Sequence, residues 1–376
     1  MIRTNVLIIG GGPAGATAAR ILAANKIETT LVERDLSYAK PCGGGIPSSA
    51  FEELDIPETC VKKKIKKISI VSPAGEKIDV ELAGGYLCIT ERGSFDKHLR
   101  QLALEQGASI MEGLFNRFEE NGNNVISVVQ KKISREEIRI KADYVIAADG
   151  ITSKTASALK IPRPAAISTV SALIKPADYD ACEFWFGTEH ASNFYSWVFP
   201  SDGYASIGTG STTPKNLTSF LDVFVRRRFH ASLEEMNRQN LLGKTRAFKM
   251  PEWNGTLFNR GNVLFAGDAA GTVLPVLYEG IYYAMKSGEL AARALIDGNP
   301  DLYKKLWNSR FRSRFLLMRA IRKHLFRDNE RIEKWVELHK RPDVQELAMK
   351  LWLNKKYGGK SILSSYVKMF RHFIKY

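Results

Sequence analysis

Apolar positions in the first part of the chain form two short runs, and the segment between them has the spacing of a helix. Residues 5–10 form one apolar run, residues 13–25 place small residues at helical spacing, and residues 28–33 form a second run. Short continuous runs are typical of strands buried on both faces of a parallel sheet. The pattern predicts a strand–helix–strand unit of about thirty residues.

Further along, the pattern changes from parallel-sheet runs to alternating and helical segments. The predicted elements, in chain order, are a helix at 94–106, a hairpin at 125–130 and 136–141, a buried strand at 143–148, an antiparallel sheet within 165–212, a strand at 262–266, a helix at 280–297 and mostly helices beyond 300. The expected fold class is α/β: a Rossmann-like dinucleotide-binding domain, an antiparallel-sheet substrate domain and a helical C-terminal region.

This organisation predicts three domains in a chain of 376 residues. The nucleotide-binding domain is discontinuous and takes residues 1–160 and 255–300. The substrate domain takes 161–254, and a basic helical region takes 301–376. A chain of this length buries a sizeable core without disulfide bonds or structural metals.

Charge adds a candidate surface to this picture. The net charge is +15, and residues 301–376 hold 20 Lys and Arg against 7 Asp and Glu. A second basic run occupies residues 62–67. Such segments suit anionic lipid, nucleic acid or an acidic protein, whereas the alternative is a solvated face. No RNA-binding motif accompanies the charge, so nucleic acid is the less favoured partner.

Residues 302–326 combine this charge with an apolar stripe. Seven apolar residues recur at near-helical spacing: Leu302, Leu306, Phe311, Phe315, Met318, Ile321 and Leu325. Six basic residues are interleaved with them: Arg310, Arg312, Arg314, Arg319, Arg322 and Lys323. We expect this helix to lie on anionic headgroups at a membrane surface. The competing interpretation is that the stripe packs against the protein core.

Several function classes have no support in the sequence. The four cysteines form no C-x-x-C pair and the six histidines no metal-binding spacing, so no metal site is predicted. No G-x-S-x-G elbow of a serine hydrolase occurs. Glycines interrupt the N-terminal apolar run, which predicts a buried strand rather than a signal peptide. The expected location is the cytoplasm, with the inner face of the membrane as a candidate docking surface.

The first chemical motif is the glycine turn at residues 10–15. Gly10, Gly12 and Gly15 fit G-x-G-x-x-G between the first strand and the first helix. They permit a tight turn, close approach of the backbone to a pyrophosphate, and close packing of the helix on the sheet. Glu33 ends the second strand, where its carboxylate can accept ribose hydroxyls. An acid there disfavours a 2′-phosphate, so the site suits FAD or NAD rather than NADP.

Three distant segments favour FAD over NAD. Arg92 opens a predicted helix, Asp149 ends a buried strand before a glycine, and Asp268 lies in the turn Gly-Asp-Ala-Ala-Gly. Together they resemble the fold of the group A flavoproteins. The resemblance implies that Asp268 binds the ribityl chain and that Gly280 and Ile281 present backbone N–H groups to the flavin ring.

A narrower resemblance rests on three motifs. They are Lys-Pro-Cys-Gly-Gly-Gly-Ile-Pro at residues 40–47, Tyr-Ser-Trp-Val-Phe-Pro at 195–200, and the segment 267–292. These are similar to the geranylgeranyl reductase family of FAD-dependent oxidoreductases over residues 3–300. Two positions depart from the family pattern. Tyr278 stands where glycine is usual, and Ser192 stands where proline or glycine is usual.

The resemblance implies an FAD-dependent reductase that saturates C=C bonds of a geranylgeranyl or other polyprenyl group. Cys42 is the implied catalytic residue, and Tyr195, Trp197 and Phe199 line the substrate. The complete set of expected cofactor-binding residues is Gly10, Gly12, Ala14, Gly15, Glu33, Arg34, Cys42, Gly43, Gly45, Arg92, Asp149, Asp268, Gly280 and Ile281.

Alternatives remain open at this point. A flavin-dependent monooxygenase or halogenase has the same fold, and an FAD-dependent tRNA-modifying protein would suit the basic charge. The polyprenyl group belongs to an archaeal-type lipid, a diphosphate, a chlorophyll side chain or a quinone. The electron donor is NAD(P)H or reduced ferredoxin, because FAD occupies the single dinucleotide fingerprint of the sequence.

Overall fold

The structure, a computed structural model, describes residues 1–353 apart from 122–123 and 214–215. Its contacts divide the chain into two units, each assembled from three separate segments. Unit 1 comprises Met1–Ala39, Gly93–Ala165 and Met250–Phe315, and unit 2 comprises Lys40–Arg92, Ala166–Lys249 and the described part of Leu316–Tyr376. Residues 40–92, expected in the nucleotide-binding domain, therefore cluster with the antiparallel sheet. The boundaries of the functional domains stay a prediction.

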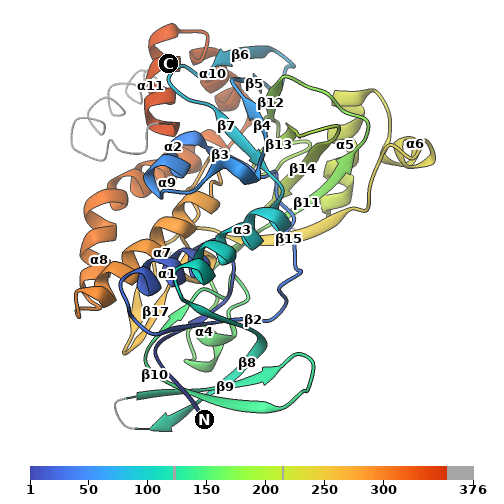
Figure 1. Cartoon of the computed structure of the whole chain (residues 1–376). Coiled ribbons are helices and arrows are strands. Elements are labelled where there is room, and N and C mark those ends of the chain that lie inside the picture. The colour runs from blue at the N-terminus through green and yellow to red at the C-terminus, as the bar shows by residue number, and fades with distance from the viewer. Residues whose placement is uncertain (122–123, 214–215, 354–376) are drawn as a thin grey trace. The chain divides into compact units, whose positions relative to one another are not determined.

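The N-terminal apolar run forms the centre of the parallel sheet in unit 1. Strand β1 (Ile2–Ile9) pairs in parallel with β2 (Thr29–Glu33) on one side and with β10 (Glu137–Ala147) on the other. Strand β17 (Val263–Phe265) continues the parallel pairing beyond β10, and helix α1 (Pro13–Ala24) connects β1 to β2. The predicted strand–helix–strand unit and the α/β fold class are confirmed (Figure 1).

One prediction in this sheet is wrong. Residues 136–141 and 143–148 were expected as two strands, but β10 is continuous from Glu137 to Ala147. Its first half pairs antiparallel with β9 (Asn124–Lys131), which itself pairs with β8 (Ser109–Asn121). Its last residues are buried between β1 and β17. The change from alternating to continuous apolar residues marks a change of surroundings along one strand rather than a break.

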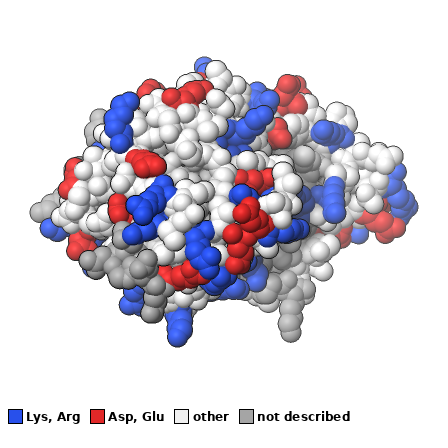
Figure 2. Space-filling view, turned by 60° about the horizontal axis from the view of Figure 1, so that its bottom comes forward, with Lys and Arg blue, Asp and Glu red and all other residues white. Residues whose placement is uncertain are grey.

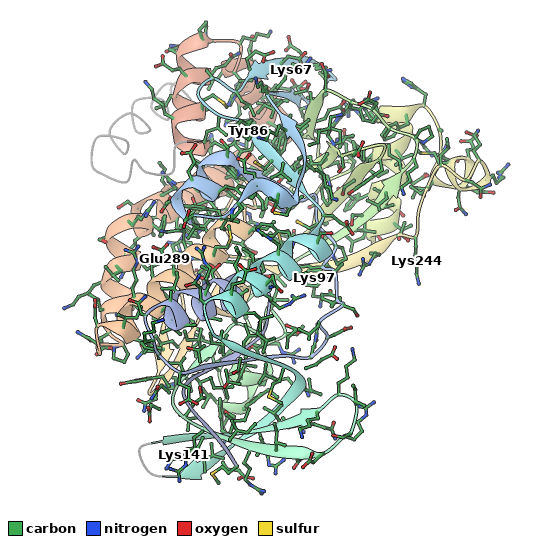
Figure 3. The ribbon with its side chains drawn as sticks, viewed as in Figure 1. Lys67, Tyr86, Lys97, Lys141, Lys244 and Glu289 are labelled. Atoms are coloured by element: carbon green, nitrogen blue, oxygen red, sulfur yellow. The ribbon has the colours of Figure 1, made fainter. Side chains whose placement is uncertain are left out.

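Helix α7 (Ile281–Ile296) packs against α1, as Figure 1 shows. A Cβ at Gly288 would overlap the backbone carbonyl of Ala14, so glycine is required where the two helices meet. Glu289, labelled in Figure 3, is buried in α7 and pairs with Lys286 and Arg293 of the same helix. The predicted helix at 280–297 is confirmed. The remaining elements of unit 1 are α3 (Arg92–Glu105), which begins at the last residue of a unit 2 segment, α4 (Lys154–Ala158), β16 (Asn259–Arg260) and α8 (Leu302–Trp307).

Unit 2 contains a mostly antiparallel sheet whose strand order is β15-β11-β14-β13-β12-β5-β6. The region predicted as an antiparallel sheet supplies β11 (Ala166–Ile174), β12 (Ala181–Trp185), β13 (Ser196–Pro200) and β14 (Ala205–Ser211). Three strands that the sequence did not place complete it: β5 (Lys67–Val71), β6 (Lys77–Glu81) and β15 (Arg246–Pro251). One face is covered by helix α5 (Leu217–Phe229), whose Leu221, Phe224 and Val225 lie in a buried cluster with Val198 and Ile207.

A small three-stranded sheet and the C-terminal helices complete unit 2. The small sheet has the order β3-β7-β4, and the C-terminal region is helical through Trp352. Residues 354–376 of the predicted helical region lie outside the described residues. The elements concerned are β3 (Gly45–Pro47), α2 (Ser48–Glu53), β4 (Val61–Ile65), β7 (Leu87–Thr90), α6 (Leu233–Arg238), α9 (Ser313–Leu325), α10 (Asn329–Leu338) and α11 (Pro342–Trp352).

The apolar stripe at 302–326 does not face outward, contrary to the expectation of a membrane-bound helix. A turn of π-helix, Asn308–Arg312, joins α8 to α9, and Phe311 and Phe315 pack against the rings of Tyr283 and Trp307. Both phenylalanines are almost wholly buried. The stripe therefore belongs to the protein core, which is the usual role of an amphipathic helix.

The basic run at 62–67 is largely neutralised within unit 2. Lys63 pairs with Asp178 at 2.8 Å, and Lys64 pairs with Glu58 at 2.6 Å. Lys67, labelled in Figure 3, pairs with Asp180 at 2.7 Å. The face of the molecule in Figure 2 likewise places Lys and Arg among Asp and Glu. This run is a solvated face with its own counter-charges.

Candidate functional site

The glycine turn after β1 has the backbone that its sequence requires. Gly10 has φ +107°, and a Cβ there would overlap the carbonyl of Ala148. A Cβ at Gly15 would overlap the carbonyl of Gly10, so α1 starts directly against the turn. At Gly12, which begins α1, no atom lies within 4 Å of such a Cβ. The open N-terminus of α1, with no acidic residue in its first turn, is suited to a phosphate group.

Glu33 lies at the end of β2 beside this turn. Its Oε2 accepts a hydrogen bond from Gly11 N at 2.6 Å, and its Oε1 accepts one from Asp35 N at 3.1 Å. The two bonds fix the carboxylate near the helix N-terminus and leave lone pairs for further donors. Arg34 is exposed, and its guanidinium lies 5.5 Å from the ring centroid of Tyr38.

Arg100 of α3 is a member of this site that the sequence analysis missed. Its side chain is buried, and its guanidinium donates to Gly11 O at 3.0 Å and to Leu36 O at 2.8 Å. It thereby bridges the glycine turn and the segment that follows Glu33. A planar guanidinium serves two acceptors at once, which a lysine ammonium does with less geometric control.

Replacing Arg100 with methionine is expected to weaken binding of the adenosine half of the cofactor about tenfold. The variant removes two charge-assisted hydrogen bonds that hold Gly11 and Leu36, and such bonds contribute about 1.5–3 kcal/mol each before compensation. Titration calorimetry with ADP measures the effect without any turnover. Arg135→Met, at an exposed turn, is the control. Equal ADP affinities of the two variants would show that Arg100 does not organise the turn.

A second glycine turn meets the first through α1. It contains Gly267, at φ +64°, whose added Cβ would lie 3.0 Å from the Cβ of Ala14. Gly267 N donates to Ser287 Oγ at 2.8 Å. In the same turn, Asp268 Oδ1 lies 4.0 Å from the position of a Cβ at Gly280. The structure thus brings Ala14, Asp268 and Gly280 together, with Ile281 as the first residue of α7.

Tyr278, one of the two departures from the family pattern, has a backbone conformation that favours glycine. Its φ is +48°, in the left-handed region, and its side chain is 8% exposed. A non-glycine residue in this region costs on the order of 1 kcal/mol. The backbone has therefore kept the left-handed turn and accommodated a buried aromatic ring beside Glu279 and Gly280.

Unit 1 also contains a buried carboxylate oxygen without a partner. Asp149 Oδ2 accepts from Thr155 N at 3.0 Å and from Thr155 Oγ1 at 2.9 Å, whereas Oδ1 is buried without a hydrogen bond. Asp149 adjoins Ala148, against which Gly10 packs. A buried acceptor of this kind calls for a ligand donor. With the open end of α1 and the fixed carboxylate of Glu33, the residues present fit a dinucleotide such as FAD.

In unit 2, the loop containing Cys42 lies against the antiparallel sheet. A Cβ at Gly43 would lie 2.5 Å from the ring of Phe199, and one at Gly45 would lie 3.1 Å from it. Gly44, with φ +77°, accepts from Thr90 N at 2.9 Å and from Thr90 Oγ1 at 3.1 Å. Only glycines permit so close an approach to the sheet.

Cys42 differs in its exposure from the other cysteines. It is exposed, and its Sγ accepts from Gly44 N at 3.4 Å, whereas Cys60, Cys88 and Cys182 are buried. Burial raises the pKa of Cys88 to about 12, and burial also raises the pKa of Cys182 well above its usual value. Buried thiols of this kind are unreactive. Cys42 is therefore the thiol of this chain that is available for chemistry.

Two of the predicted substrate residues, Trp197 and Phe199, lie on one face of β13, and the third, Tyr195, directly precedes the strand. Trp197 lies opposite Gly208 of β14, where its indole occupies the space of a side chain, and its Nε1 donates to Ser206 Oγ at 3.3 Å. Tyr195 and Phe199 each contact the ring of Phe184 at a centroid distance of 5.2 Å. Phe184, Gly208 and Gly210 extend this face and were not predicted. Their signal was present in the alternation of the neighbouring strands.

The predicted site residues thus fall into two groups. Unit 1 holds Gly10, Gly12, Ala14, Gly15, Glu33, Arg34, Asp149, Asp268, Gly280 and Ile281. Unit 2 holds Cys42, Gly43, Gly45, Arg92, Tyr195, Trp197 and Phe199. Arg92 is buried at the start of α3. Within each unit, glycines and side chains distant in sequence are brought into contact.

Comparison with known proteins agrees with this arrangement. Residues 3–297 match the family described as FAD binding domain, so FAD is the cofactor. A geranylgeranyl diphosphate reductase of Rhodobacter capsulatus is 31% identical over 371 residues, which cover 94% of this chain and 93% of the relative. A digeranylgeranylglycerophospholipid reductase of Thermoplasma acidophilum is 30% identical over 349 residues, which cover 83% of this chain and 85% of the relative.

Solved structures lead to the same family. A geranylgeranyl bacteriochlorophyll reductase-like protein from Thermoplasma acidophilum has a TM-score of 0.80 and 25% identity, covering 91% of this chain and 92% of that chain. A flavin-dependent brominase has a TM-score of 0.75 and 16% identity, covering 99% of both chains, and shares the fold alone. The chain belongs to the geranylgeranyl reductase family of FAD-dependent oxidoreductases.

Proposed function

We propose that the protein is an FAD-dependent reductase that saturates C=C bonds of a geranylgeranyl or other polyprenyl group. The observation that carries the proposal is the 31% identity with a geranylgeranyl diphosphate reductase across nearly the whole of both chains. The halogenase and monooxygenase alternative rests on relatives whose likeness is one of fold.

The reaction sets clear demands on the protein. An isolated alkene has no carbonyl to polarise, so binding must orient it and exclude water. FAD, when bound and reduced by the electron donor, would supply the hydride that one alkene carbon takes up. The second carbon takes up a proton, and saturation adds two hydrogens in all. We assign the orientation of the alkene to an apolar face of the sheet, formed by Tyr195, Trp197, Phe199 and Phe184.

We assign the proton to Cys42. Its thiol is exposed and lies in a loop whose glycines rest on Phe199. A thiol can donate a proton to a substrate carbon and recover one from water. Glu33, Asp268 and the N-terminus of α1 are assigned to cofactor binding, where they accept hydroxyl hydrogens and face the phosphate charge.

Two variants separate these roles. Cys42→Ser is expected to retain FAD but to slow double-bond reduction about 10²-fold or more, in line with loss of a general acid. Trp197→Ala is expected to impair prenyl turnover while leaving reduction of the flavin by dithionite unchanged, because it removes a ring that we assign to the substrate and changes none of the residues that we assign to FAD. Anaerobic stopped-flow absorbance with geranylgeranyl diphosphate measures both. Normal prenyl turnover by both variants would contradict the assigned roles.

The function itself is tested by mass spectrometry of lipids and quinones from cells with and without the gene. The expected result is that loss of the gene leaves one polyprenyl compound lighter by whole pairs of hydrogens. Unchanged polyprenyl masses would argue against a reductase. The acceptor that shifts identifies the substrate as a lipid, a diphosphate, a chlorophyll or a quinone, and purified protein with NAD(P)H or reduced ferredoxin identifies the donor.

Contact with an anionic membrane surface is a further part of the proposal, since polyprenyl substrates reside in lipid. Residues 302–327 contain nine Lys and Arg and no Asp or Glu. The exposed members among them are Lys304, Lys305, Arg312, Lys323 and Arg327. The apolar stripe is buried, so charge alone supports this contact. Among the described residues, no helix has the length and apolar character needed to cross a bilayer.

A further inference from the structure

The loop that carries Cys42 is held on its N-terminal side by a contact between a cation and an aromatic ring. The ammonium of Lys40 lies 4.3 Å from the centroid of the Phe248 ring. Phe248 belongs to β15, which is one of the two edge strands of the seven-stranded sheet in unit 2. A cation at this distance over a ring is attracted by the negative face of the aromatic system.

On its other side the same loop is fastened to the interior of unit 2. Gly43 and Gly45 rest on Phe199 of β13, and the carbonyl of Gly44 accepts two hydrogen bonds from Thr90 of β7. Cys42 lies between these fastenings, two residues after Lys40 and one before Gly43. The loop therefore runs across the sheet from its edge strand to β13.

The dimensions agree with such a crossing. Strands β11 and β14 separate β15 from β13, so three strand spacings amount to about 14 Å. The backbone from Lys40 to Gly43 spans at most about 10 Å, and the extended lysine side chain covers the remainder. The strands crossed include β14, whose Gly208 makes room for the indole of Trp197.

We propose that the Lys40–Phe248 pair is a positioning element that holds Cys42 over the aromatic face of β13. The glycine contacts hold the part of the loop after Cys42, and the Lys40–Phe248 pair acts on the part before it. Pro41 lies between Lys40 and Cys42, and its ring fixes its own φ angle. The position of Lys40 therefore restricts the position of Cys42. Loss of either partner removes this interaction from the N-terminal half of the loop, so that the Sγ of Cys42 samples a wider range of positions.

The consequence for the reaction rests on the proposed function. A thiol held in one position can donate its proton to a double bond bound at one place on the aromatic face. A mobile thiol is in position to donate less often each time a double bond binds there. Lys40→Met and Phe248→Leu should therefore raise the share of partly reduced products. They leave the cofactor-binding residues of unit 1 unchanged.

The test is a double-mutant cycle read by hydrogen exchange. The variants are Lys40→Met, Phe248→Leu and their combination, and the control is Lys249→Met, which changes the next residue of the same strand. Exchange at the amides of residues 42–44, measured by mass spectrometry on the FAD-bound protein, is expected to rise about three- to tenfold in each single variant. The combined variant should show the effect of one single variant, because the two side chains form one interaction.

Conservative variants distinguish a positioning role from a general loss of structure. Lys40→Arg and Phe248→Tyr keep a cation and a ring, so both are expected to restore exchange to within about twofold of the unaltered protein. Additive effects in the combined variant, or exchange that matches the Lys249→Met control, would overturn the proposal.

The two proposals fail in different ways. If the exchange results are as expected and the unaltered protein reduces no prenyl compound, the positioning role stands and the proposed function falls. If prenyl compounds are reduced and the exchange cycle shows no coupling, the positioning role falls alone. A change in partly reduced products that follows the exchange rates across all five Lys40 and Phe248 variants would connect the two.

Discussion

Glu33→Arg is expected to lower the affinity for FAD about tenfold to a hundredfold. The carboxylate is held by Gly11 N at 2.6 Å and by Asp35 N at 3.1 Å, and its remaining lone pairs face the site where we place the ribose. A hydrogen bond to a charged group contributes about 1.5–3 kcal/mol. A guanidinium also places positive charge beside backbone N–H groups, which disturbs the glycine turn itself.

The measurement is quenching of flavin fluorescence during titration of the apoprotein with FAD. Glu28→Arg is the matched control, because it makes the same change of charge just before the other end of β2, where Glu28 is exposed. The control should bind FAD as the unaltered protein does. Equal affinities for the two variants would remove Glu33 from the cofactor site.

Gly288→Val is expected to destabilise the protein by about 3 kcal/mol, the upper end of the usual cost of overpacking a core. Even the Cβ alone would overlap the carbonyl of Ala14, and both α1 and α7 are buried along most of their length. Because Ala14 lies in the first turn of α1, displacement of that helix should also reduce FAD binding.

Thermal unfolding followed with and without FAD measures both effects. Lys305→Val adds the same side chain at an exposed position of α8 and is expected to change the melting temperature little. The cofactor should raise the melting temperature of Gly288→Val less than that of the control, since a weaker ligand stabilises less at a given concentration. Equal melting temperatures for the two variants would show that the helices can separate at no cost.

The nucleotide-binding half was predictable because its signals are local. The turn at Gly10–Gly15, the apolar runs on each side of it and the acid at Glu33 all lie within about thirty residues, the length of one strand–helix–strand unit. Gly10 and Gly15 are required because backbone approaches backbone there, and such a requirement fixes the residue type at a given position of the sequence. The antiparallel sheet was predictable in part for the same reason, through its alternating aromatic residues.

What the sequence could not supply were contacts between distant segments. Arg100 binds carbonyls at Gly11 and Leu36, and a carbonyl is present at every position, so its acceptors have no sequence signature. Strand β5 joins β12 more than a hundred positions later, and nothing in its own pattern names that partner. The sequence of α9 predicts an apolar face, but it does not indicate which residues pack against that face.

The way the two units share the chain has a consequence for biosynthesis. The segments of each unit alternate along the sequence, so neither unit exists as a continuous stretch. The α7 helix that packs on α1 ends at Ile296, and a ribosome needs about 15–60 s to reach it at common elongation rates. During that interval β1, the glycine turn and α1 have been synthesised, but α7, which packs against α1 in the folded protein, has not. We therefore expect the nascent chain to bind holding chaperones, and we expect FAD to bind only after most of the polypeptide has been synthesised.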